Sequence, residues 1–217
     1  MSYEDVVSRA AAAAARVGRD PASVTVVAVS KAKSVSDIGA VYEMGHRDFG
    51  ENRAQEMADK AARLPDDIRW HFIGGLQANK ARLVRPITHL LHSMDRESLA
   101  GAWAKGNGLP PPVLLQVNTG REPQKSGVMP EEARATLGRI VAMGMEVRGL
   151  MAIPPIADDP EDQRSHFALL RSLRDDLARD HPAIEELSMG MTDDFEVAVE
   201  EGSSIIRVGR AIFGERT

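Results

Sequence analysis

The sequence predicts an α/β fold, more specifically a single (β/α)8 (TIM) barrel. Short runs rich in β-branched residues alternate with longer segments of helical periodicity, which is typical of βαβ units in a parallel sheet. Eight such runs can be counted along the chain. The chain has 217 residues, somewhat fewer than the roughly 250 of a typical barrel of this kind, so its loops must be short. A doubly wound open sheet remains the alternative architecture.

The expected strands recur at regular intervals. They are Val24–Ser30, Arg47–Gly50, Arg69–Ile73, His89–Ser93, Pro112–Val117, Glu146–Met151, Glu186–Met189 and Ile205–Val208. Helices are expected at Tyr3–Val17, before the first strand, and between later strands, for example at Glu131–Ala142 and Gln163–Ala178. Because no linker or shift in composition separates two parts, residues 1–217 are expected to form one domain.

Composition and charge exclude several classes of function. The formal charge is -5, with 27 basic and 32 acidic residues mixed along the chain, so no basic surface for nucleic acid or a membrane is expected. The chain has no cysteine, which excludes disulfides, thiolate metal sites and cysteine nucleophiles, and indicates a cytoplasmic protein. The acidic N-terminal segment does not resemble a secretory signal, and no apolar run reaches the roughly 20 residues that span a bilayer.

Lys31 is the first candidate for chemistry. It follows the most apolar predicted strand and should therefore lie at the carboxyl end of that strand, where barrels of this kind place their reactive groups. A lysine amine in apolar surroundings has a lowered pKa and can attack an aldehyde to form a Schiff base. The alternative is that Lys31 only ends the strand with a solvated charge.

Two glycine-containing segments could bind phosphate. In Ser188–Asp194, after the seventh strand, Ser188, Gly190 and Met191 could face an anion through backbone N–H groups. The segment after the eighth strand supplies Arg207, Gly209 and Arg210. Barrels often bind phosphate between these two loops, although either glycine could also belong to an ordinary turn.

Two asparagines could complete the same site. Asn52 follows the second predicted strand and Asn79 lies shortly after the third, so their amides could point into the barrel mouth. Helix capping is the alternative for both residues, and it is less convincing for Asn79, which is expected just inside a helix.

Other chemistries lack their motifs. The six histidines have no metal-binding spacing, so no metal is expected, and His71 and His92 are interpreted as structural strand residues. The chain also lacks a GxSxG elbow, a Walker A loop and a dinucleotide-binding GxGxxG motif.

Several segments together resemble the family of pyridoxal phosphate (PLP) homeostasis proteins. These are VAVSKAK, FGENRAQE, WHFIGGLQANK, LLQVNTGREPQKSG, GLMAIPP, SMGMTDDFEVAV and IRVGRAIFGER. They occur in the family's order between Val24 and Arg216, and the coincidence of so many independent segments makes the resemblance specific.

The resemblance implies a barrel like the N-terminal domain of alanine racemase. It also implies that pyridoxal 5′-phosphate forms a Schiff base with Lys31 and that its phosphate is held around Ser188–Met191 and Arg207–Arg210. Asn52 and Asn79 map to asparagines near the cofactor in the family. Where the family often has threonine, this chain has Arg210, so a hydroxyl contact to the phosphate is lost.

The function expected from the resemblance is PLP homeostasis, with PLP bound but not used in catalysis. The alternative is a minimal PLP-dependent amino-acid racemase, and a purely structural role ranks last. Racemases of this fold type take a second proton donor, a tyrosine, from an added domain. The two tyrosines of this chain, Tyr3 and Tyr42, are not expected near a strand's carboxyl end. PLP-dependent apo-enzymes are the expected partners, and a monomer the expected state.

Overall fold

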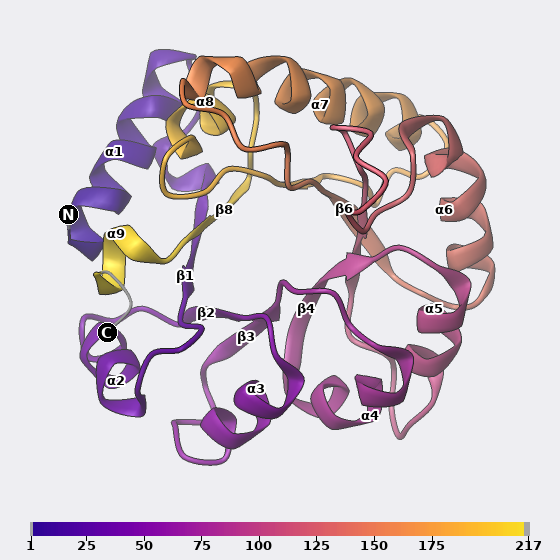
Figure 1. Ribbon diagram of the computed structural model, residues 1–217, viewed down its shortest axis with the longest axis horizontal. Helices are drawn as coiled ribbons and strands as arrows, with labels where there is room; N and C mark the ends of the chain where they lie inside the picture. Colours follow the sequence, from indigo (N-terminus) through magenta and orange to yellow (C-terminus); the bar gives the residue numbers. More distant parts are fainter. Residues whose placement is uncertain (1, 215–217) are drawn as a thin grey trace.

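The computed structural model describes residues 2–214 and contains a closed barrel of eight parallel strands (Figure 1). Glu215 and Arg216, which end the last of the segments quoted above, lie outside the described residues. The strands are β1 (Thr25–Val29), β2 (Asp48–Glu51), β3 (Arg69–Phe72), β4 (Thr88–Met94), β5 (Val113–Gln116), β6 (Val147–Met151), β7 (Glu186–Ser188) and β8 (Ile205–Val208).

Pairing between the first and last strands closes the sheet. Thr25 of β1 is in register with Ile205 of β8, and the pairing continues to Ala28 and Val208. Each strand is parallel to its neighbour in chain order. The predicted (β/α)8 barrel is therefore confirmed, and the open-sheet alternative is wrong because the eight strands form a closed ring in chain order, which leaves no edge strand.

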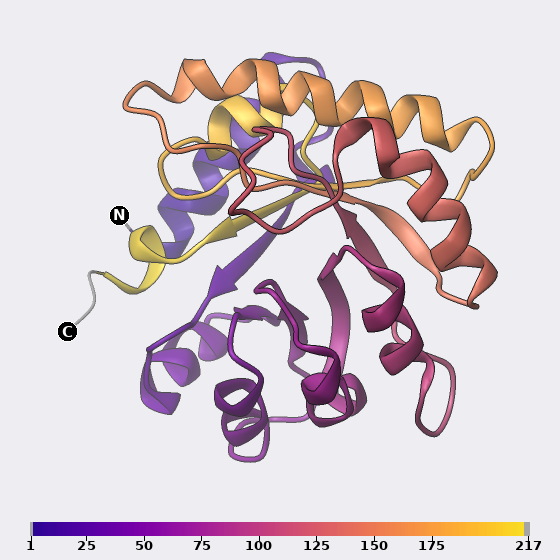
Figure 2. The same cartoon turned by 45° about the vertical axis from the view of Figure 1, so that its right-hand side comes forward.

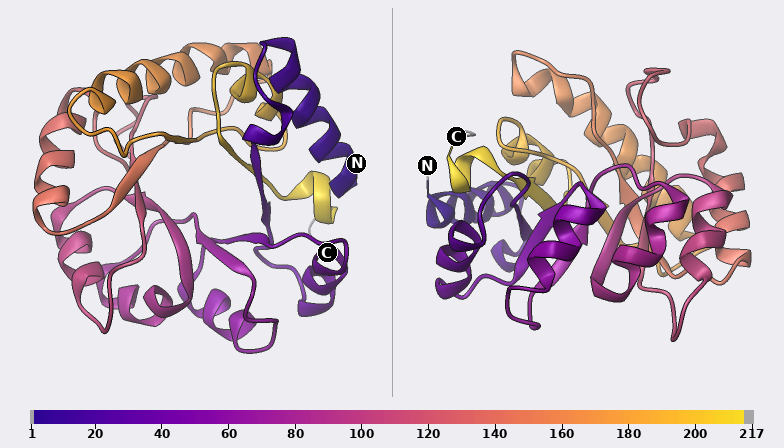
Figure 3. Two further views of the ribbon diagram at one scale, coloured as in Figure 1. Left: turned by 180° about the vertical axis from the view of Figure 1, so that it is seen from behind. Right: turned by 60° about the horizontal axis from the view of Figure 1, so that its bottom comes forward.

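Nine α-helices cover the outside of the barrel within residues 2–214 (Figures 1 and 3). They are α1 (Tyr3–Arg16), α2 (Val35–Glu43), α3 (Ala54–Ala61), α4 (Ala81–Val84), α5 (Glu97–Ala104), α6 (Ala133–Ala142), α7 (Arg164–Ala178), α8 (Phe195–Glu200) and α9 (Arg210–Phe213). Figure 2 shows α7 running past α8, which in turn packs against α1. No helix within residues 2–214 has the length and apolar character needed to span a membrane.

Short 3-10 turns explain where two predicted helices differ from the observed ones. The helix expected at Glu131–Ala142 begins with the 3-10 turn Pro130–Glu132, and the one expected from Gln163 begins after the turn Pro160–Gln163. In both turns a proline occupies the first position, where its missing N–H costs no hydrogen bond. The α-helical parts therefore start a few residues later than predicted.

The apolar core has a main layer between strands and helices and a smaller cluster inside the barrel. The inner cluster joins side chains of β1, β4, β5, β6 and β8, which can meet only across the barrel interior. Its members are Val27, Leu90, Leu114, Met151 and Ile205. The rest of the interior contains polar side chains, among them His71, His92 and Arg207. A barrel interior filled in this way is a solid support for a site at the carboxyl ends of the strands.

Candidate functional site

A cavity of about 510 Å³ opens at the carboxyl ends of the strands. Its walls come from the segments that follow β1, β2, β3, β6, β7 and β8. The lining residues are Val29, Lys31, Lys33, Asn52, Ile73, Gly74, Ile153, Met191, Thr192, Asp193, Arg207, Gly209, Arg210 and Gly214. The site therefore lies where the strand ends converge, with most of its polar groups supplied by β1, β7 and β8.

Lys31 lies in a tight turn directly after β1. The strand ends at Val29, and the Lys33 N–H donates to the Ser30 carbonyl over 3.0 Å. Ala32, within this turn, has a positive φ of 59°, a left-handed conformation that is uncommon for a residue with a Cβ. The turn reverses the chain, so that the half-buried Lys31 lines the cavity instead of continuing the strand outward.

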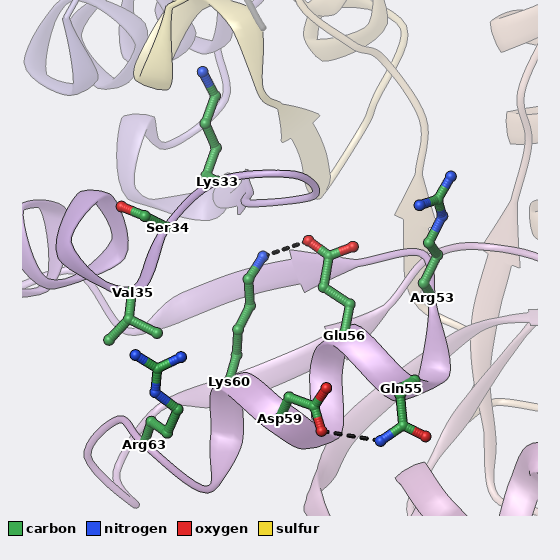
Figure 4. A pocket seen from close by; sticks show the side chains of 9 residues that line it. All are labelled: Lys33, Ser34, Val35, Arg53, Gln55, Glu56, Asp59, Lys60 and Arg63. Atoms are coloured by element: carbon green, nitrogen blue, oxygen red, sulfur yellow. Dashed lines mark hydrogen bonds and ion pairs between the residues drawn. The ribbon is translucent and has the colours of Figure 1, made fainter. Parts of the chain in front are cut away.

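The buried Lys60 of α3 is hydrogen-bonded to the backbone of this turn. Its Nζ donates to the Ser30 carbonyl over 2.8 Å, to Glu51 Oε1 over 2.6 Å and to Glu56 Oε1 over 2.7 Å. Figure 4 shows Lys60 and Glu56 pointing toward each other below the turn, while Lys33 extends in the other direction. All three donor positions of the ammonium are thus used, as a buried charge requires.

Two further hydrogen bonds connect the same charges to the turn. The Ala32 N–H donates to Glu56 Oε1 over 2.6 Å, and the Ser30 hydroxyl donates to Glu51 Oε1 over 2.7 Å. Burial raises the pKa of the Glu51 carboxyl, although Lys60 and Ser30 act in the opposite direction. Lys31 is therefore carried by a segment whose backbone is bonded on both sides of it to α3 and β2.

Asn52 lies at the end of β2 and lines the cavity. It does not cap α3, because the N-cap residue is Arg53 and no side chain makes the capping bond. Gly74 packs directly against it: a Cβ at Gly74 would lie 2.5 Å from the Asn52 carbonyl oxygen and 2.7 Å from its Cβ. Only glycine lets the segments after β2 and β3 approach this closely.

The loop after β7 is held by its own aspartate. The Met191 N–H donates to Asp194 Oδ1 over 2.6 Å, and the Phe195 N–H donates to the Met191 carbonyl over 2.9 Å. Burial raises the pKa of the Asp194 carboxyl. Gly190 has φ +93° and packs against α8, since a Cβ there would lie 2.5 Å from the Ala198 Cβ. Gly190 thus shapes the loop from outside the cavity wall, and Met191 belongs to the wall.

Arg207 of β8 is the buried cation of the site. It is 3% exposed and lines the cavity. Its Nη1 donates to the Ser188 hydroxyl over 2.6 Å and its Nη2 donates to the Ala152 carbonyl over 2.9 Å. Burial lowers the pKa of the guanidinium to about 10. Ser188 itself is fully buried behind Arg207 and does not line the cavity.

Gly209 and Arg210 follow β8 and both line the cavity. Gly209 is the N-cap residue of α9, and Arg210 is the first residue of that helix. The exposed Arg210 guanidinium donates to the Asp193 carboxylate, which connects the loops after β7 and β8. These loops therefore form one side of the cavity together.

The cavity contains most of the residues that were predicted to form the site. Six of them line it: Lys31, Asn52, Met191, Arg207, Gly209 and Arg210. Asn79 does not, because it is exposed in a 3-10 turn, Ala78–Lys80, beyond β3. Ser188 and Gly190 lie behind the wall, as described above. Lys33, Ile73, Gly74 and Ile153 were missed, although each directly follows a strand end or the turn after it, which is a usable signal.

The lining residues suit an anionic carbonyl compound. Among the described residues, four basic side chains and one carboxylate, that of Asp193, line the cavity; the basic residues are Lys31, Lys33, Arg207 and Arg210. Neighbouring cations disfavour the protonated form of a lysine amine, and a neutral amine is the form that attacks a carbonyl. No group of three or more metal-binding side chains gathers anywhere in residues 2–214.

Comparison with known proteins gives consistent results. The family model for the alanine racemase N-terminal domain matches residues 6–217. A pyridoxal phosphate homeostasis protein of Aquifex aeolicus is 42% identical over 217 residues, with 97% of this chain and 95% of the relative aligned. One from Pseudomonas aeruginosa is also 42% identical, over 97% of this chain and 93% of the relative.

Solved structures show the same similarity. PipY of Synechococcus elongatus, whose structure was determined with PLP bound, is 36% identical and superimposes with a TM-score of 0.78, covering 95% of this chain and 99% of PipY. Alanine racemase of Corynebacterium glutamicum is only 17% identical, with a TM-score of 0.72 over 96% of this chain and 59% of the racemase, so it shows a shared barrel fold alone.

Proposed function

The chain belongs to the family of pyridoxal phosphate homeostasis proteins, and from this premise we propose that it binds pyridoxal 5′-phosphate in the cavity at the strand ends and holds it on Lys31 as a Schiff base, without catalytic turnover. The observation that carries the proposal is the position of Lys31. Its amine belongs to a firmly held turn, and the cavity that it lines is rich in cations.

The residues around the cavity fit the parts of this cofactor. Arg210 and the backbone N–H groups of Gly209 and Arg210 are proposed to bind the phosphate, since the first N–H groups of a helix have no partner within it. Arg207, which two hydrogen bonds hold in place, is proposed to contact the ring, and Asn52 offers an amide at the end of β2, on the other side of β1. Asn79, Ser188 and Gly190 do not line the cavity, and the contacts with the cofactor that the family resemblance implies for them stay predictions.

Each side chain has a simple task in this arrangement. When bound, the cofactor supplies an aldehyde, and the Lys31 amine condenses with it, losing one water to form the Schiff base. Lys33, Arg207 and Arg210 line the same cavity and bring the positive charge that suits an anionic phosphate. Lys60 and the carboxylates of Glu51 and Glu56 keep the turn that carries Lys31 in place.

A role without turnover is supported by where the tyrosines lie. Racemisation needs a proton donor on the face of the cofactor opposite the lysine. The Tyr3 hydroxyl pairs with His46 Nδ1 at 3.0 Å, and the Tyr42 hydroxyl donates to Asp67 Oδ1 over 2.8 Å. Neither tyrosine lines the cavity. Neither tyrosine is therefore placed to act as the second proton donor that the racemase alternative requires.

The proposal also covers the partners, the oligomeric state and the location of the protein. PLP-dependent apo-enzymes are the proposed acceptors of the bound cofactor, and the chain is proposed to act as a monomeric, single-domain protein over residues 1–217. A cytoplasmic location is proposed as well, in keeping with the cysteine-free composition. Each of these remains a prediction.

Absorption spectroscopy of the purified protein tests the proposal. After PLP loading and desalting, the wild type should show a Schiff-base band in the near-visible range, which Lys31→Ala should remove. The exposed Lys105, far along the chain from the cavity residues, provides the control: Lys105→Ala should retain the band. Loss of the band in Lys33→Ala but not in Lys31→Ala would move the covalent link to Lys33.

An amino-acid racemase assay completes this test. The loaded wild type should convert neither enantiomer of alanine or of other common amino acids. Sustained racemisation that depends on Lys31 would favour the enzyme over the carrier.

A further inference from the structure

A continuous row of polar side chains crosses the barrel interior and ends at Arg207. Asp48 Oδ1 lies 3.0 Å from His71 Nε2, and His71 Nδ1 lies 2.9 Å from His92 Nε2. His92 Nδ1 lies 2.8 Å from the Ser188 hydroxyl, which accepts from Arg207 Nη1 over 2.6 Å. The row thus connects five strands: β2, β3, β4, β7 and β8.

All five members of this row are buried. Of these five, only Arg207 lines the cavity. His92 and Ser188 are fully buried, His71 is 2% exposed and Asp48 is 7% exposed. Burying polar groups is costly unless each donor meets an acceptor, so the protons in the row must be arranged in a consistent order. That order can be deduced from the ends of the row.

The carboxylate end fixes the direction. Asp48 can only accept when ionised, so His71 must donate from Nε2. A neutral His71 then accepts at Nδ1 from His92 Nε2–H, and a neutral His92 accepts at Nδ1 from the Ser188 hydroxyl. The Ser188 oxygen is left to accept from Arg207. Every donor in the row has an acceptor in this one direction.

The reverse direction leaves a proton without a partner. If His71 carried both protons, His92 would have to donate to Ser188, and the Ser188 hydroxyl would need another acceptor. Within the described residues, Ser188 Oγ contacts only His92 and Arg207. A second buried cation near Arg207 would also be unfavourable. The neutral arrangement is therefore preferred.

The charges at the two ends agree with this order. Burial by itself would raise the pKa of Asp48, but hydrogen bonds from Arg69 and His71 hold it well below its ordinary value, so Asp48 is ionised. Burial lowers the pKa of His92, and the charge of the nearby Arg207 acts in the same direction, so His92 is neutral. Among the described residues, no carboxylate hydrogen-bonds to Arg207: Asp194 acts on it only through its charge, so the row supplies the hydrogen-bonded connection of Arg207 to a carboxylate.

We propose that His71 and His92 are positioning residues that, together with Asp48 and Ser188, form a directed hydrogen-bond relay fixing the Arg207 guanidinium at the cavity. The relay acts on cofactor binding through Arg207, and in that respect it rests on the proposed function. Its order of protons is a property of the protein without cofactor and can be measured independently.

Nitrogen NMR of the cofactor-free protein, labelled with 15N-histidine, tests the relay directly. At neutral pH, His71 and His92 should both be neutral and both carry their proton on Nε2. A proton on Nδ1 of either ring, or a charged His92, would overturn the proposed direction.

Substitution of His92 tests whether the relay positions Arg207. His92→Gln keeps a donor and an acceptor about as far apart as the two ring nitrogens, whereas His92→Leu keeps neither. PLP dissociation should be about tenfold faster for His92→Leu, which is the upper end of the contribution of one neutral hydrogen bond, and should return toward the wild-type rate for His92→Gln. Equal rates for all three proteins would contradict a positioning role.

Two controls distinguish a failure of the relay proposal from misfolding of a variant and from a failure of the proposed function. Thermal unfolding of the cofactor-free variants identifies a His92→Leu protein that does not fold, and the wild-type NMR result then decides the proposal. If the wild type binds no PLP, the proposed function fails, whereas the histidine protonation states still test the relay.

Discussion

The turn that carries Lys31 is held by residues that are distant from Lys31 in the sequence. The position of Lys31 at a strand end could be predicted because barrel strands end at the site. The contacts of Lys60 with the turn around Lys31 could not be predicted, since they depend on how α3 packs against β1. The same is true of Ser188: its place after a strand indicated a cofactor contact, but its side chain bonds to His92 and Arg207.

Removing Lys60 should strongly destabilise the protein. Lys60→Met leaves the carboxylate of Glu51 buried without its cation, and breaking a buried pair in this way costs about 3–5 kcal/mol. The free energy of unfolding in urea measures the loss. Adding Glu51→Gln to Lys60→Met should recover part of the stability, because the uncompensated charge is gone. Full stability of Lys60→Met alone would contradict the role of this cluster.

Asp48 should make the stability of the protein depend on pH at the acidic end. Its pKa is lowered in the folded state from 3.8, so its ionised form stabilises the fold above about pH 4 and this contribution is lost as the pH falls further. Asp48→Asn should therefore be less stable than the wild type at pH 7, with a smaller difference at pH 3, as measured by urea unfolding.

The exposed Asp66 provides the control for this measurement, because Asp66→Asn removes a carboxylate from the surface. The stability difference between Asp66→Asn and the wild type should be small at both pH values. A stability gap for Asp48→Asn that does not narrow on acidification would contradict the ion pairing of Asp48 in the folded protein.

At the scale of elements, the eight strands agree with the sequence pattern to within one residue at each end. Buried parallel strands are short apolar runs between turn residues, and this signal does not depend on distant contacts. The helix starts at Ala133 and Arg164 were predicted too early, because 3-10 turns and α-helical turns have similar sequences. Asn79 was likewise expected just inside a helix but lies exposed in such a turn.

Close packing of the segments after β2 and β3 should be needed for the site. Gly74→Ala would place a Cβ 2.5 Å from the Asn52 carbonyl oxygen, so the segment that carries Asn52 must move. PLP should then dissociate at least several-fold faster, as followed by loss of the bound absorption band. Gly138→Ala in α6 is the matched control: a Cβ there has no neighbour within 4 Å, and alanine favours a helix. Equal dissociation rates for the two variants would show that this contact does not shape the site.

For the whole molecule, closure of the barrel brings together residues from both ends of the chain. Lys31 and Arg207 line one cavity because β8 pairs with β1. Apart from the family resemblance, the sequence could predict this closure only through the number of strands, since an open sheet has the same local pattern. Closure makes the loops after β7, β8 and β1 neighbours. It also encloses an interior in which the polar row from Asp48 to Arg207 is buried.

Cofactor binding should therefore stabilise the whole barrel. A ligand that binds only the folded state adds about 2.7 kcal/mol when its concentration is 100 times its dissociation constant. The thermal unfolding midpoint of the wild type should rise with PLP concentration, and that of Lys31→Ala should rise much less at the same concentrations. Identical shifts for both proteins would mean that Lys31 contributes nothing to binding.

Reductive trapping tests the central claim most directly. Treatment of the PLP-loaded protein with borohydride converts a Schiff base into a stable amine, and peptide mass spectrometry then locates the modified residue. The modification is predicted on Lys31 at near-stoichiometric yield, with little on the other lysines. A protein that carries no modification, or carries it mainly on a lysine outside the cavity, would contradict the account.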